Sequence, residues 1–243
     1  MLIVNADDWG RTAEETDAAL RCHRAGRITS VTAMVFMADS QRAAALAMRH
    51  GMDVGLHLNL SQPFTGPGQD DALDAAQRRT CASLGAGRLA FLVYHPLLQR
   101  DLLCTYRAQV DEFRRLYGRA PSHVDGHHHR HLCANVLWGR VIPEGEKVRR
   151  NFHFWPGEKA WLNRAYRRIA DRRLARRYRV TDYFFALSQC LQGDRLARVL
   201  ALAHSHSVEV MAHPAQAAEL DCLMSDRYLA ALQSVERGTY ASI

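Results

Sequence analysis

The sequence has almost no lysine and no closely paired cysteines, and each absence narrows the range of functions. Among its 32 basic residues only Lys147 and Lys159 are lysines, so the net charge of +7 comes from arginine. The six cysteines are scattered, and none forms the C-x-x-C pair that is typical of a cysteine-ligated zinc site. We therefore expect reduced, mostly buried thiols and no zinc site built on cysteine.

Long apolar runs are also missing. No stretch of about 18 apolar residues occurs, so we predict no transmembrane segment. The N-terminus, MLIVNADDWGR, lacks a basic region followed by a long apolar region, which predicts no signal peptide and a cytoplasmic location. We find no nucleic-acid-binding motif and no aromatic residues interleaved with the arginine run, so we expect no nucleic acid as a partner.

The chain does contain a regular alternation of strand-like and helix-like segments over its 243 residues. This alternation predicts an α/β protein with a mostly parallel sheet covered by helices. We expect a single domain over residues 1–243, built as an irregular, TIM-like (β/α) barrel with about seven strands. An open doubly wound sheet is the alternative. The predicted strands are 2–5, 31–37, 53–60, 122–125, 148–154, 181–185 and 208–211.

Acidic and imidazole side chains stand at the ends of four predicted strands. Asp7 and Asp8 end the first strand, His57 lies on the third, and His213 follows the last. The short strand at 122–125 ends at Asp125 and runs into a cluster with four histidines in five positions: His127, His128, His129 and His131. Because the carboxyl ends of parallel strands meet at one edge of the sheet, we expect these side chains to gather there.

Carboxylates and imidazoles are the ligands that a divalent cation takes. One carboxylate and two imidazoles leave positions open for water and a substrate oxygen, as a hydrolytic site requires. In the Asp7–Asp8 pair one residue can hold the metal while the other acts as a general base. If the histidine cluster is extended, His127, His129 and His131 point to one side and His128 to the other.

Arginine is concentrated between residues 164 and 179, in a segment predicted to be helical. Two interpretations of this segment are open. The arginines either form a solvated helix face or bind an anionic substrate, lipid headgroup or partner.

Five sequence blocks resemble the YdjC-like carbohydrate deacetylase family. They are LIVNADDWG, RITSVTAMVFM, GLHLNL, HVDGHHHRH and VEVMAHPA, which occur in the family's order and span residues 2–215. The resemblance implies a distorted β/α barrel that hydrolyses the N-acetyl group of an amino-sugar-containing carbohydrate and releases acetate. Trp9 departs from the family pattern, in which phenylalanine is more usual after the paired aspartates.

The resemblance also implies a role for each site residue. Asp7 would be the general base, and His213 the acid that protonates the leaving amine. The metal ligands would be Asp8, His57 and His127. Asp125 would orient either His213 or a ligand histidine, and His129, His131 and Trp9 would lie in the second shell or face the substrate. The resemblance implies one Mg²⁺ ion, although two imidazole ligands also suit Zn²⁺ or another transition metal.

Two further questions stay open at the level of sequence. A metal-dependent phosphoesterase on the same Asp/His scaffold is the alternative function, with phosphate in place of acetate as the released product. The N-acetylated sugar substrate is free, phosphate-linked or lipid-linked, and a phosphate would suit the arginine-rich segment. A homodimer is compatible with the sequence.

Overall fold

The computed structural model describes residues 1–87 and 90–243, which divide into two compact units. Unit 1 consists of Met1–Asp7, Asp17–Val31 and Gly145–Ile243, and unit 2 consists of Asp8–Thr16 and Thr32–Glu144. The first strand, the first helix and the second strand each contribute residues to both units. The single domain expected over residues 1–243 stays a prediction.

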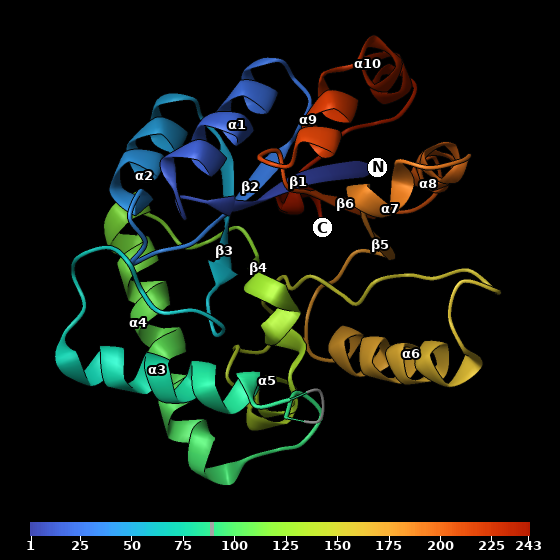
Figure 1. Ribbon diagram of the computed structural model, residues 1–243. Helices are drawn as coiled ribbons and strands as arrows, with labels where there is room; N and C mark the ends of the chain where they lie inside the picture. Colours follow the sequence, from blue (N-terminus) through green and yellow to red (C-terminus); the bar gives the residue numbers. More distant parts are fainter. Residues whose placement is uncertain (88–89) are drawn as a thin grey trace. The chain divides into compact units, whose positions relative to one another are not determined.

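The described residues form a six-stranded sheet with the strand order β4-β3-β2-β1-β6-β5 (Figure 1). The pairs β1–β6, β5–β6 and β3–β4 are parallel. The predicted α/β class is therefore confirmed, whereas the irregular TIM-like barrel with about seven strands is not. The strands are β1 (Leu2–Trp9), β2 (Ser30–Ala33), β3 (Asp53–Leu58), β4 (Val124–Gly126), β5 (Tyr183–Ala186) and β6 (Val208–Ala212).

The segment 148–154, predicted as a strand, does not form one. Its neighbour Lys147 makes an isolated bridge to Arg179, and the backbone N–H groups of Val148 and His153 donate to Arg179 and Phe184. These bonds are too widely spaced to form a ladder, so the chain here is extended but irregular.

Helices follow most of the strands. Thr12 caps the start of the first helix, because its Oγ1 accepts from the Glu15 N–H at 3.4 Å and donates to the Glu15 carboxylate at 3.1 Å. None of the described helices is both long and apolar enough to cross a membrane. The α-helices are α1 (Ala13–Arg24), α2 (Ser40–Arg49), α3 (Asp71–Gly85), α4 (Gln99–Tyr117), α5 (Ala134–Gly139), α6 (Trp161–Ala175), α7 (Leu187–Cys190), α8 (Arg195–Ala203), α9 (Ala217–Met224) and α10 (Asp226–Gln233).

In unit 2, helix α4 packs against α2, α3 and β3 (Figure 1). Its buried side chains recur at helical spacing, so one face points into the core of the unit. The helix ends at Gly118, whose φ of 65° is left-handed and whose N–H donates to the Arg114 carbonyl. This packing supports β3, the strand that carries His57.

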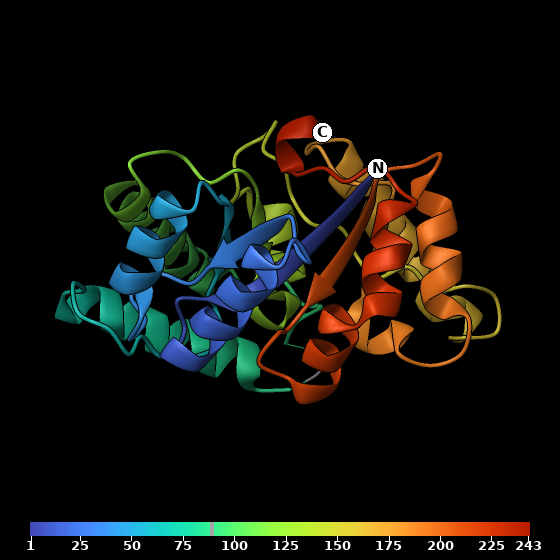
Figure 2. The ribbon, with the colours of Figure 1, turned by 90° about the horizontal axis from the view of Figure 1, so that it is seen from above.

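In unit 1, β6 pairs with β1 on one side and with β5 on the other. All five residues of β6 are buried, as expected for a parallel strand covered on both faces. Helices α7 and α8 contact β6, and α9 contacts α10 (Figure 2). The register places Ala6 of β1 beside Ala212, the last residue of β6.

Candidate functional site

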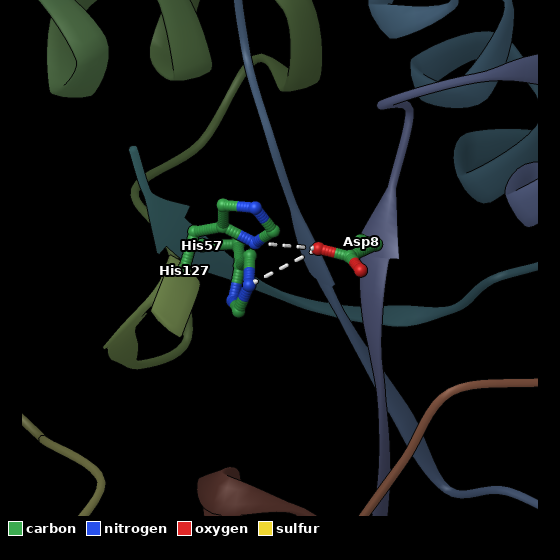
Figure 3. A group of neighbouring side chains, drawn as sticks. All are labelled: Asp8, His57 and His127. Atoms are coloured by element: carbon green, nitrogen blue, oxygen red, sulfur yellow. Dashed lines mark ion pairs between the residues drawn. The ribbon is translucent and has the colours of Figure 1, made fainter. Parts of the chain in front are cut away.

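The three predicted ligands come together in unit 2 (Figure 3). Asp8 Oδ1 lies 3.3 Å from His57 Nε2 and 2.9 Å from His127 Nδ1. All three residues are buried, with exposed fractions of 6%, 1% and 4%. One ligand atom from each falls within 4.8 Å of the others, so the three side chains converge on one point.

The backbone at Asp8 helps to direct its carboxylate. Its φ of 65° lies in the left-handed region, which non-glycine residues seldom adopt. Such a conformation costs free energy and is found mostly where the surrounding structure enforces it, often at functional sites. The end of β1 thus departs from the regular strand at the residue that faces the two imidazoles.

Asp125 fixes the orientation of His57. Its Oδ1 lies 2.7 Å from His57 Nδ1, and its Oδ2 accepts a hydrogen bond from Thr32 Oγ1 at 3.0 Å. The carboxylate bond on Nδ1 leaves Nε2 directed at Asp8. A carboxylate behind an imidazole is the usual support of a metal-ligating histidine. Of the two partners expected for Asp125, His213 or a ligand histidine, the structure therefore places it against His57.

The histidine cluster is not extended. His127–Leu132 forms a 3₁₀ turn in which His128 and His129 have φ values of 53° and 55°. The alternation of sides expected for an extended cluster therefore does not apply, because the turn rotates successive side chains by other angles. Only His127 joins the group around Asp8, while the rings of His129 and His131 lie 6.2 Å apart.

Charges around the cluster favour an ionised Asp8. Burial by itself would raise the pKa of Asp8, but hydrogen bonds to His127 and His57 hold it well below its usual range. His128 lies on the rim, where its Nδ1 is 3.1 Å from Ser61 Oγ, and burial lowers its pKa to about 4. His128 is thus favoured in its neutral form at neutral pH.

The other predicted catalytic residues, Asp7 and His213, belong to unit 1. Asp7 follows Ala6 on β1 and His213 follows Ala212 on β6, and these two alanines are paired. The register therefore brings Asp7 and His213 to neighbouring strand ends. The buried carboxylate of Glu219 accepts from the His213 backbone N–H at 2.7 Å, and its other oxygen lies 3.9 Å from His213 Nδ1.

Asp7 is held by a residue that the sequence analysis missed. Arg149 donates to both Asp7 oxygens at 2.7 Å and to Glu209 Oε1 at 2.8 Å. Asn5 donates to Asp7 Oδ1 at 2.9 Å, and Tyr240 donates to Glu209 Oε2. A signal was present in the sequence, since Glu209 stands between valines in a buried strand and requires a cationic partner.

Trp9 is completely buried in unit 2. Its carbonyl accepts from the Met34 N–H at 2.8 Å, which links the ends of β1 and β2. A tryptophan at this position packs in the core and does not present its ring at the surface. Its expected role beside the substrate, and the roles of His129 and His131, stay predictions.

Known proteins resemble this chain over most of its length. A carbohydrate deacetylase of Mus musculus is 32% identical over 88% of this chain and 77% of its own. The Homo sapiens carbohydrate deacetylase is 33% identical over 88% of this chain and 74% of its own. A chitooligosaccharide deacetylase of Yersinia pestis is 31% identical over 56% of this chain and 52% of its own.

Two solved structures share the fold. The Xyl-CE4 domain of a multidomain xylanase from a termite hindgut metagenome superimposes with a TM-score of 0.51 at 8% identity, covering 99% of this chain and 87% of that one. An Enterococcus faecalis protein named for cellobiose-phosphate cleavage gives 0.66 at 18% identity, covering 99% and 97%. At these identities the likeness concerns the fold alone.

The family profile described as YdjC-like protein matches residues 1–236. This range contains the Asp8 cluster of unit 2 together with Asp7, Arg149 and His213 of unit 1. The match agrees with the resemblance carried by the five sequence blocks. The chain belongs to the YdjC-like family.

Proposed function

We propose that this protein is a metal-dependent hydrolase that removes N-acetyl groups from an amino-sugar-containing carbohydrate and releases acetate. The observation that carries the proposal is the convergence of Asp8, His57 and His127, with Asp125 behind His57. The relatives named carbohydrate deacetylase and chitooligosaccharide deacetylase supply the substrate class. The part of the chain that matches the YdjC-like family includes Asp8, His57 and His127.

The three residues suit a divalent cation. They offer two imidazole nitrogens and one carboxylate oxygen, in a buried cluster whose carboxylate is kept ionised. Zn²⁺ and other transition metals accept this mixed donor set. We propose Mg²⁺ because the family resemblance implies it. When bound, the cation supplies the Lewis acid that amide hydrolysis at neutral pH requires.

The remaining steps belong to the side chains of unit 1. Asp7 takes a proton from the water that attacks the acetamide carbon, and Arg149 keeps its carboxylate in one orientation. His213 gives a proton to the sugar nitrogen as the C–N bond breaks, so acetate and a free amine leave. Glu219 positions His213 through the backbone N–H.

The test is acetate release from N-acetylglucosamine oligomers, free, phosphate-linked and lipid-linked, with and without added Mg²⁺ or Zn²⁺. Asp7→Asn is expected to lower kcat at least about a hundredfold with the metal still bound, because a general base contributes that much. Asp39→Asn is the matched control, since Asp39 is another buried carboxylate paired with an arginine, Arg42. It is expected to leave kcat unchanged.

Two results would contradict the proposal. Phosphate release from sugar phosphates without acetate release would favour a phosphoesterase instead. Equal acetate release by wild type and Asp7→Asn would remove Asp7 as the base. We also propose a cytoplasmic location, which agrees with the six free cysteines of the structure, and a homodimer, which sedimentation analysis tests.

A further inference from the structure

Unit 1 contains a cavity that the proposed hydrolysis does not use. It has a volume of about 430 Å³ and lies between α6, the irregular segment 150–154 and the amino end of β5. Two of its lining residues, Asp182 and Tyr183, lie at the start of β5, and His206 precedes β6. We call it the arginine pocket.

The arginine pocket is remote from His213. His206 lies just before β6 and His213 just after it. At a rise of about 3.3 Å per extended residue, the strand separates the two histidines by roughly 20 Å. The pocket therefore opens at the amino ends of the strands, whereas Asp7 and His213 stand at the carboxyl ends.

Positive charge exceeds negative charge in the pocket. Four arginines line it, and the two acids that share the lining, Asp171 and Asp182, already have donors from the chain. Asp171 accepts from the Arg150 side chain at 3.1 Å, and Asp182 accepts from the N–H and hydroxyl of Ser207 at 2.9 and 2.8 Å. Four arginines against two carboxylates leave the lining with a net charge of +2, which favours an anionic ligand.

Three of these arginines come from one face of α6. Arg164, Arg167 and Arg168 are spaced three and four residues apart, so they share a side of the helix. Within residues 1–87 and 90–243, Arg164 and Arg168 have no hydrogen-bond or ion-pair partner for their guanidinium groups. Arg167 is half-buried over the Phe154 ring, and burial lowers its pKa although Asp171 raises it.

Aromatic rings form the rest of the lining. Phe152 stacks on Phe184 with ring centroids 4.7 Å apart. Tyr183 meets His153 and His206 edge to face, at 4.9 and 5.2 Å. Flat ring faces beside guanidinium groups suit a ligand with an anionic group attached to a ring.

We propose that the arginine pocket binds a phosphate ester of a ring compound, with the phosphate on Arg164, Arg167 and Arg168 and the ring against Phe152 and Tyr183. Phosphate matches the guanidinium groups in charge and in hydrogen-bond geometry. A sugar phosphate and a nucleotide share this chemistry, and the experiment below distinguishes them. The site is additional to the proposed hydrolysis and does not depend on it.

The experiment measures binding by titration calorimetry with three probes: inorganic phosphate, glucose 6-phosphate and AMP. At least one ester is expected to bind more tightly than inorganic phosphate, and the tighter ester identifies the ring. The double variant Arg164→Gln/Arg168→Gln is expected to lose affinity at least about tenfold, because two charge-assisted hydrogen bonds are removed.

The matched control is Arg172→Gln/Arg176→Gln. These arginines have the same spacing on α6 and its end, are exposed, and do not line the pocket. The control variant is expected to bind like wild type. An equal loss in both variants would assign binding to general surface charge and overturn the proposal. Equal affinity for all three probes, or no binding by any of them at about 1 mM, would also overturn it.

Discussion

Replacement of Arg149 by methionine tests the buried charge network of unit 1. Arg149 and Glu209 are fully buried and Asp7 is 3% exposed, so no solvent compensates either carboxylate once the guanidinium group is removed. Loss of one partner from a buried ion pair costs about 3–5 kcal/mol. For a chain of this size 1 kcal/mol shifts the Tm by about 2–4 °C, so Arg149→Met is expected to lower the Tm by about 6–20 °C.

The measurement is thermal unfolding followed by circular dichroism, with urea unfolding as a second probe. The triple variant Asp7→Asn/Arg149→Met/Glu209→Gln removes all three charges and is expected to recover much of the lost stability. Uncompensated charge is the stated cause, so a triple variant no more stable than Arg149→Met would refute the reasoning. A Tm for Arg149→Met within about 2 °C of wild type would refute it as well.

Further predictions concern the Asp8 cluster and unit 2. Asp125→Asn is expected to weaken Zn²⁺ or Mg²⁺ affinity about 10- to 100-fold, because His57 loses the carboxylate behind it, and calorimetry measures the change. His57→Ala is expected to lose metal by elemental analysis, and full occupancy would remove His57 from the ligand set. Gly66→Ala is expected to destabilise the protein by about 1–3 kcal/mol in urea unfolding, because a Cβ there would lie 2.3 Å from the Met37 carbonyl oxygen.

Sequence patterns were sufficient where the signal is local. The apolar run before Asp7 and Asp8 identified β1. The strand-end positions of Asp8, His57 and His127 indicated a shared site, and the structure brings these three together. Each inference rests on neighbouring residues and on the rule that parallel strands align their carboxyl ends.

Other features required the folded chain. The turn at His128 and His129 depends on left-handed backbone conformations that the sequence HHHRH does not predict. The segment 148–154 has the composition of a strand, yet it forms no ladder. The arginines of α6 divide between a pocket and an exposed face, which only the packing of that helix decides.

The bond between Asp7 and Arg149 shows the difference most clearly. The sequence by itself determined that a buried strand ends in two carboxylates and that another carries Glu209 in its middle. Only the tertiary structure decided which cation pairs with Asp7 and Glu209, because Arg149 lies 142 residues from Asp7 and 60 from Glu209. Hydrophobic periodicity can be recognised from neighbouring residues in the sequence. The partner of a buried charge depends on the three-dimensional packing that brings distant segments within hydrogen-bond distance.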